Sequence, residues 1–154
     1  MPSTIKSSTG CAAKLMVTGS LKALFDGGKI EVCTGAAPAT ADAARTGDVI
    51  WTIQKDDGEG GVEGLVFDAA ASGRSAVKPS DDTWGGPTVA GVAGYGRLVA
   101  AADDGTESTT QARIQFLVRS TGGLGLYLSN TTLTTDADVL AKTLAAFSVT
   151  LPTY

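Results

Sequence analysis

The residue types that most often carry out catalysis are scarce in this sequence. Its 154 residues include no histidine, which excludes a Ser-His-Asp triad, a Cys-His pair, a histidine-ligated zinc ion and an imidazole proton shuttle. The two cysteines, Cys11 and Cys33, form no CxxC pair, so neither a zinc knuckle nor a redox motif is present. They are interpreted either as two buried, reduced thiols or as a disulfide that ties the N-terminal segment to the first strand.

Acidic residues cluster at four places, and each cluster could be a ligand set or a solvated turn. None of them has the spacing of a calcium loop, which ends on a bidentate Glu, so they are interpreted as turns. A carboxylate pair for glycoside hydrolysis would need a sugar-binding cleft, and the low aromatic content, 6%, argues against one. The clusters are Asp56-Asp57-Gly58-Glu59, Asp81-Asp82, Asp103-Asp104-Gly105-Thr106-Glu107 and Asp136-Ala137-Asp138.

Glycine-rich segments could bind phosphate, because such loops expose backbone N–H groups. The segments GEGGVEG, GGPTVAGVAGYG and STGGLGL contain no GxxxxGK[ST] motif and are not flanked by a strand and a helix. They are therefore interpreted as turns. Together with the lack of histidine, this predicts a protein that is not an enzyme and that has no cofactor and no metal site.

The composition favours one globular domain that binds neither nucleic acid nor a membrane. The sequence is 43% hydrophobic and contains 20 glycines, which predicts a single core and many turns. Its formal net charge of −4 has the wrong sign for neutralising phosphates. The apolar stretches are too short to span a bilayer. Residues 1–10 lack the regions of a secretory signal, which predicts synthesis in the cytoplasm.

The N-terminal region is expected to contain an arm and a helical segment. Residues 1–10 are rich in Ser and Thr, so they are expected to move freely unless a neighbouring subunit holds them. The domain organisation is therefore an arm, 1–14, and a β-sandwich domain, 15–154. From residue 12 the apolar spacing predicts a helix that is interrupted at Gly19-Ser20 and ends at Asp26-Gly27-Gly28. Its apolar side comprises Leu15, Met16, Leu21, Leu24 and Phe25.

Short strands follow, separated by turn-forming residues. In KIEVCTG (29–35) apolar residues alternate with the others, as in a half-buried strand. DVIWTIQ (48–54) places Trp51 in the core, and VEGLVFDA (62–69) predicts another strand. Residues 70–93 are interpreted as a long irregular connection, and its Trp84 either caps the sandwich or anchors a partner.

The clearest strand signal is an antiparallel hairpin formed by residues 95–120 around the Asp103-Asp104-Gly105 turn. Its inward-facing residues are expected to be Ile114, Phe116 and Val118, whereas Arg113, Gln115 and Arg119 are expected to face solvent or a partner. Leu117 breaks this pattern and indicates a second covered face. Arg97, Arg113 and Arg119 are expected to share one polar face that is either solvated or paired with acidic turns of another subunit.

Two further segments complete a predicted all-β fold. Leu124, Leu126 and Leu128 lie on one strand face, and the last segment alternates over Ala145, Phe147, Val149 and Leu151. About seven short strands separated by turns predict an antiparallel β-sandwich, jelly-roll-like, with a short N-terminal helical segment.

Three stretches give the sequence a family resemblance. They are LKALFDGGKIEVCTGAAPATADAARTG, then GPTVAGVAGYGRLVAAADDG followed by ARIQF, and LAAFSVTLP. They resemble small structural proteins of tailed bacteriophage virions, in particular capsid decoration, or cement, proteins. The matching features include the connection Gly35–Ala44 and the aromatic-x-Arg-Leu strand Tyr95-Gly96-Arg97-Leu98. Cys33 departs from the pattern, which has an aromatic residue there.

The resemblance implies a jelly-roll-like protein on the outer capsid surface that bridges capsomers, with the major capsid protein as partner. A dimer or trimer is expected, and many weak contacts on a symmetric shell reinforce one another. The irregular and terminal segments, 1–14, 78–92 and Tyr154, are the expected contact elements. The residues expected to bind partners are Ile5, Lys6, Lys78, Trp84, Arg97, Arg113, Arg119 and Tyr154.

Two other hypotheses stay open at this point. One is a minor tail or baseplate component, which would be present in about three, six or twelve copies per virion. The other is a carbohydrate-binding β-sandwich that uses Trp84, Tyr95 and Tyr127 as its exposed aromatic residues.

Overall fold

The computed structural model describes residues 5–68, 75–121 and 126–151. Within these ranges it contains two short helices and twelve strands, most of them brief. They are β1 (Ile5–Ser7), α1 (Thr9–Thr18), α2 (Leu21–Phe25), β2 (Lys29–Thr34), β3 (Val49–Asp56), β4 (Val62–Glu63), β5 (Ser75–Val77), β6 (Trp84–Gly86), β7 (Gly91–Val99), β8 (Arg113–Arg119), β9 (Leu126–Tyr127), β10 (Thr132–Leu133), β11 (Lys142–Leu144) and β12 (Ser148–Thr150).

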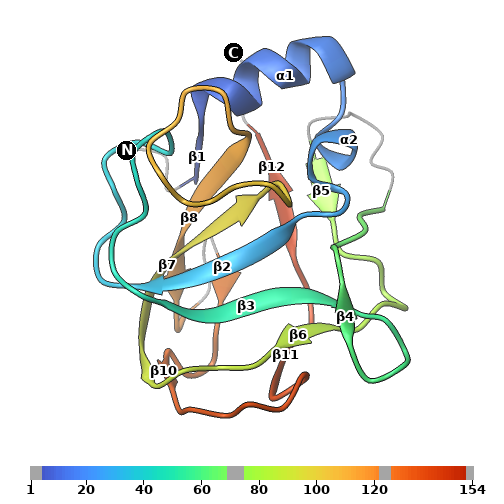
Figure 1. The fold of residues 1–154 in the computed structure, drawn as a ribbon, viewed down its shortest axis with the longest axis vertical. Coiled ribbons are helices and arrows are strands. Elements are labelled where there is room, and N and C mark those ends of the chain that lie inside the picture. The colour runs from blue at the N-terminus through green and yellow to red at the C-terminus, as the bar shows by residue number, and fades with distance from the viewer. Residues whose placement is uncertain (1–4, 69–74, 122–125, 152–154) are drawn as a thin grey trace.

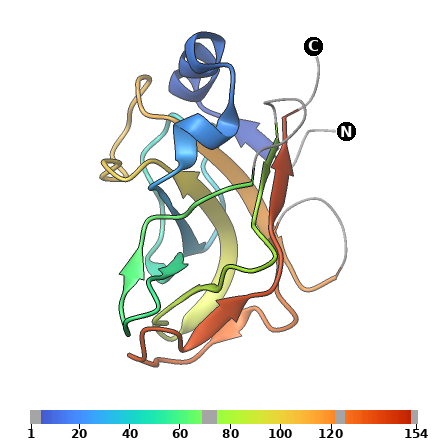
Figure 2. The same cartoon turned by 90° about the vertical axis from the view of Figure 1, so that its right-hand side faces the viewer.

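The strands form one large curved sheet and one small sheet. The large sheet runs β1-β8-β7-β2-β3-β6-β11, with β4, β9 and β10 attached to β3, β8 and β7. All of its pairings are antiparallel except that of β8 with β9. The second sheet pairs β12 with β5. Figures 1 and 2 show the small sheet facing β2 and β3 across the molecule, with α1 and α2 at one end. The predicted all-β sandwich with a short N-terminal helical segment is confirmed.

The helical segment breaks where the sequence indicates, but it begins earlier and faces differently. Gly19 ends α1 with a left-handed φ of 69°, which glycine adopts without strain. The helix starts at Thr9, where the Ser8 side chain accepts a hydrogen bond from the Cys11 N–H. Met16 does not join the apolar side as predicted, because it is 89% exposed.

The prediction that residues 1–10 move freely is wrong for the part that the structure describes. Ile5–Ser7 pairs with β8 in the register Ile5 to Phe116. Ser8 is buried, and its Oγ donates to the Gln111 carbonyl at 2.7 Å and accepts from the Arg113 N–H at 2.9 Å. This segment is therefore part of the sandwich and is held by the chain itself rather than by a neighbour.

The predicted hairpin is present as β7 and β8, with Tyr95 opposite Leu117. Ile114 and Phe116 are buried as expected, and Val118 packs against the core. A close approach explains Gly96: a Cβ there would lie 2.4 Å from Cε2 of the cross-strand Phe116 ring. The hairpin connection is a long excursion over residues 100–112 rather than a tight turn.

The described part of the predicted connection 70–93, residues 75–93, is more regular than predicted. β5 and β6 lie within this range, and β6 joins β3 and β11 in the large sheet. Trp84 is fully buried in an aromatic cluster, with its ring 5.1 Å from that of Phe67 and 6.2 Å from that of Phe147. It caps the core, and the expectation that it anchors a partner is wrong, because no part of its side chain reaches the surface.

Candidate contact surfaces

The polar strand face predicted to be solvated is covered by the chain itself. Arg97, Arg113 and Gln115 do lie on one face of β7 and β8, but they are 1%, 0% and 2% exposed. The connection from β2 to β3, residues 35–48, lies over them and supplies carbonyl oxygens. We call this face, with Glu31 and Asp103, the covered polar face. Leu117, an apolar residue on the same face of β8, correctly indicated that this second face is covered.

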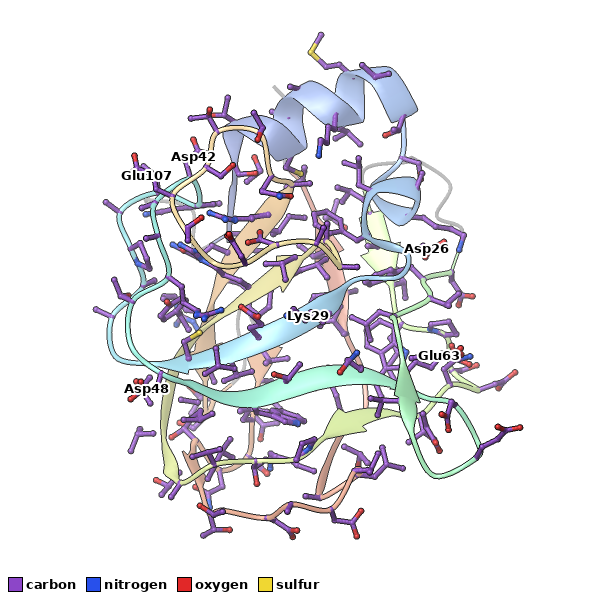
Figure 3. All side chains as sticks on the ribbon, in the orientation of Figure 1. Asp26, Lys29, Asp42, Asp48, Glu63 and Glu107 are labelled. Atoms are coloured by element: carbon purple, nitrogen blue, oxygen red, sulfur yellow. The ribbon has the colours of Figure 1, made fainter. Side chains whose placement is uncertain are left out.

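Arg113 is the centre of the covered polar face. Its Nε donates to Oδ2 of Asp103 at 2.5 Å and its Nη2 donates to Oδ1 at 2.8 Å, so the ion pair is bidentate. Nη2 also donates to the Thr106 carbonyl at 2.6 Å, and Nη1 reaches the Asp42 carbonyl at 3.3 Å. Arg113 therefore ties both long connections to β8. Figure 3 labels Asp42 and Glu107 on these two connections, which are joined by the Ser108 N–H and the Asp42 carbonyl at 2.8 Å.

Arg97 and Gln115 hold the middle of the same connection. Arg97 Nε donates to Oε1 of Gln115 at 3.1 Å, and Nη2 donates to the Ala43 carbonyl at 2.9 Å. The Gln115 amide donates to the Pro38 carbonyl at 2.8 Å. Burial lowers the pKa of Arg97 below its ordinary value, and the nearby Arg113 charge acts in the same direction. These contacts are internal, so the predicted roles of Arg97 and Arg113 in partner binding are wrong.

Glu31 completes the covered polar face on β2. Its two carboxylate oxygens accept from Arg45 at 2.8 Å and from Lys29 at 3.0 Å. Burial by itself lowers the pKa of Arg45, but the hydrogen bond and charge of Glu31 outweigh it and leave that pKa raised. The connection is thus fixed at Pro38, Ala43 and Arg45 and forms a rigid cover.

Of the aromatic residues considered for carbohydrate binding, only Tyr127 is accessible. Trp84 and Tyr95 are both fully buried, whereas Tyr127 is 56% exposed. The Tyr95 hydroxyl donates to the Thr46 carbonyl at 2.6 Å and accepts from the Thr46 N–H at 2.9 Å. Tyr95 therefore fixes the end of the connection, and of the predicted set Tyr127 alone remains available for stacking.

Both cysteines are buried, free thiols. Burial raises the pKa of Cys11 and of Cys33 from 9.0 to about 11. We therefore expect neither thiol to react with iodoacetamide at pH 8 in the folded protein, because the thiolate is the nucleophile. Both should react once denaturant is added, with labelling followed by mass spectrometry. Rapid labelling of either thiol without unfolding would contradict this.

The raised pKa values of the two thiols predict that the stability of the protein depends on pH. Above pH 9 the unfolded thiols lose their protons first, so the unfolded state binds fewer protons than the folded state. The free energy of unfolding should therefore fall as the pH rises from about 9 to about 11, and replacing both cysteines with alanine should reduce this slope.

An apolar groove opens between β9 at the edge of the large sheet and the β5–β12 sheet. It has a volume of about 650 Å³, and Figure 2 shows β12 running along the side where it lies. Its floor includes Phe147 from the aromatic cluster, and two exposed alanines line its wall. The lining residues are Ile5, Val77, Lys78, Pro79, Ser80, Leu126, Tyr127, Ala145, Ala146, Phe147, Ser148 and Thr150.

A second apolar surface lies at the end of the sandwich opposite α1, where β7 begins (Figure 1). Val89 is 54% exposed and Val92 is 59% exposed. The backbone here is held firmly: the Val89 N–H donates to the Ile50 carbonyl at 2.8 Å, and the Ala90 N–H donates to Oγ1 of Thr135 at 3.0 Å. We call Val89 and Val92 the valine end. It falls within the predicted contact segment 78–92.

The remaining predicted contact residues fall into three groups. Ile5 from the predicted arm and Lys78 from the predicted loop both line the groove. Lys6 is exposed and donates to the Ala39 carbonyl at 2.8 Å, and Arg119 is half-buried at the end of β8. Tyr154 lies outside the described residues. Val89 and Val92 lie in the predicted contact segment 78–92 but were not singled out, and the exposure of Met16 and Val17 was missed, because single exposed apolar residues leave no periodic signal.

No family model matches the sequence, and neither a curated protein nor a solved structure matches it. Neither helix in the described part is long and apolar enough to cross a membrane. Among the described residues, no three His, Cys, Asp or Glu side chains are grouped so that they could hold a metal ion.

Proposed function

We propose that this chain is a non-enzymatic structural protein of a tailed-phage virion, and specifically a decoration protein that binds the outside of the capsid. It is made in the host cytoplasm and joins the shell by contact with the major capsid protein. The sequence resemblance leads to this proposal, and the all-β sandwich is the kind of fold that the resemblance implies.

The observation that carries the proposal is the valine end. Two valines stand exposed on a backbone that is already fixed by bonds to Ile50 and Thr135. A rigid apolar surface loses little conformational entropy on binding, so even a small contact keeps most of the free energy gained by burying apolar area. A symmetric shell presents the same site many times, and an oligomer that engages several sites at once binds more tightly than a single contact would. Arg97 and Arg113, in contrast, are buried and committed to internal bonds, so they are not available for recognition.

Binding to capsids that lack the protein tests the proposal. The double variant Val89→Asp, Val92→Asp should bind such capsids at least tenfold more weakly, because two charges would be pushed against an apolar contact. Both side chains are exposed, so stability should change by no more than about 0.5 kcal/mol per site. The matched control is Val66→Asp, an exposed valine elsewhere that is 39% accessible. Undiminished binding of the double variant would reject the valine end as the capsid contact.

Copy number separates the capsid from the tail. Quantitative mass spectrometry of purified virions should find on the order of hundreds of copies for a decoration protein and about three, six or twelve for a tail or baseplate component. Deleting residues 1–10 is not a useful test of the arm, because the deletion would remove β1 and the buried Ser8.

A further inference from the structure

A polar pocket of about 210 Å³ lies directly beside the valine end. Thr88, which lines the pocket, precedes Val89 in the chain, and Thr132, which also lines it, pairs with Val92 between β10 and β7. Figure 1 shows β10 and β11 at the end of the molecule opposite α1, where the valine end lies. The pocket and the valine end therefore form one continuous surface. We call this cavity the polar pocket.

Hydrogen bonds fix the backbone that forms the polar pocket. Thr88 and Asp136 exchange two N–H to carbonyl bonds, both 2.9 Å long, and Oγ1 of Thr88 donates to the Thr134 carbonyl at 2.6 Å. Lys142 pairs with Gly86 between β11 and β6. The pocket is therefore formed before any partner binds, so little conformational entropy is lost when it is filled. It is smaller than the roughly 300–1,000 Å³ of pockets for drug-sized ligands, and its size suits a single side chain.

Asp136 and Lys142 are the two charged residues that line the polar pocket, and in the described part of the chain neither takes part in an ion pair. Nζ of Lys142 lies 5.7 Å from the centre of the Trp51 ring and donates no hydrogen bond to a described residue. One carboxylate oxygen of Asp136 accepts from the Asp138 N–H at 3.0 Å, and the other accepts from no described residue. The pocket thus offers a partner one cationic donor and one anionic acceptor.

We propose that the polar pocket receives the carboxamide group of an Asn or Gln side chain of the major capsid protein, an inference that rests on the proposed function. A carboxamide has an acceptor oxygen and two N–H donors, so it can accept from Nζ of Lys142 and donate to the Asp136 carboxylate at the same time. A carboxylate would be repelled by Asp136, and an ammonium or guanidinium group would be repelled by Lys142. Asp138 lies outside the lining and is exposed, so solvent and salt screen its charge.

The valine end and the polar pocket make different contributions to this contact. When Val89 and Val92 are covered, water is excluded from the adjoining surface, and the charges of Asp136 and Lys142 lose part of their hydration. Polar groups that are desolvated without a partner cost free energy, and a capsid protein that presents a carboxamide here avoids that cost. Hydrogen bonds to charged groups are also stronger than those between neutral groups. The valines therefore supply affinity, and the pocket discriminates between partners.

Binding of two charge variants to capsids that lack the protein tests this inference. Asp136→Asn and Lys142→Met should each bind about tenfold more weakly, because each removes the charged half of one hydrogen bond. Asp104→Asn is the matched control for the first, because the Asp104 carboxylate also accepts from an N–H two residues later, that of Thr106 at 2.9 Å, but lies between β7 and β8. Lys14→Met on α1 is the control for the second. Both controls should bind like the wild type, and circular dichroism and urea denaturation should show that all four variants fold.

The direction of the two effects identifies the group in the pocket. A neutral carboxamide requires that both variants weaken binding. If Asp136→Asn strengthened binding while Lys142→Met weakened it, the occupant would be a carboxylate, and the opposite result would indicate a cation; either result overturns the inference. If both variants bound like the wild type while the double variant Val89→Asp, Val92→Asp bound weakly, the inference would be wrong and the proposed function would stand. A wild type that does not bind capsids would reject both.

Discussion

Replacing Arg113 with methionine is expected to lower the free energy of unfolding by about 3–5 kcal/mol, the range for breaking one side of a buried ion pair. The variant leaves the Asp103 carboxylate, which is 5% exposed, without its bidentate partner. It also removes the donor to the Thr106 carbonyl. Methionine fills most of the space, so the loss is mainly electrostatic. Urea denaturation followed by circular dichroism measures it.

Two further variants make this test specific. Arg45→Met should lower stability by no more than about 1 kcal/mol, because Arg45 is partly exposed and Glu31 keeps its bond to Lys29. Adding Asp103→Asn to Arg113→Met should recover part of the loss, because the uncompensated charge is then gone. If Arg113→Met and Arg45→Met were equally mild, Arg113 would not hold the covered polar face together.

Replacing Trp84 with alanine should lower the free energy of unfolding by about 3–5 kcal/mol, as is typical of a large aromatic residue removed from a core. The indole contacts the rings of Phe67 and Phe147 and lies under the Nζ of Lys78. The cavity left behind cannot collapse easily, because these neighbours belong to different strands and connections. Thermal and urea unfolding both report the loss.

Tyr127→Ala is the matched control, because Tyr127 is an aromatic residue that is 56% exposed. It should change stability by no more than about 0.5 kcal/mol. This comparison separates a core role for Trp84 from the anchoring role that its sequence context also allowed. Near-normal stability of Trp84→Ala would mean that the residue is not part of the core.

The local features of the fold could be predicted because they depend on neighbouring residues. The Gly19-Ser20 break follows from the conformational freedom of glycine, and the positions of strands β2 and β8 follow from the two-residue period of their sequences. The expectation that residues 29–35 form a half-buried strand is wrong, because Glu31 and Cys33 are buried as well as Ile30 and Val32. The inward positions of Ile114 and Phe116 followed from the same period. Such signals need no knowledge of distant parts of the chain.

The covered polar face could not be predicted, because its partners lie far away in the sequence. Alternation assigns Arg97, Arg113 and Gln115 to the polar side of their strands, and this is correct. Residues 35–48 cover that side, and they bind the three side chains through backbone carbonyl oxygens. Because every residue has a carbonyl oxygen, no sequence pattern marks these partners. Only Leu117, an apolar residue on the polar side, signalled that this face is covered.

The contact surfaces could be predicted only in part for the same reason. Segment 78–92 was predicted as a contact element, but its Trp84 points inward and its exposed residue Val89 carries no sequence motif. The groove depends on how β9 and the β5–β12 sheet meet, which is a property of the tertiary structure.

The docking of the first strand sets a condition on how the protein is made. Ser8 accepts its buried hydrogen bond from the Arg113 N–H, 105 residues later. At a translation rate of about 5–20 residues per second, a ribosome needs roughly 5–20 s to reach Arg113 after Ser8 has been added. During that interval Ile5–Ser7 has no strand to pair with, so the nascent chain must keep this segment from aggregating before the sheet can form.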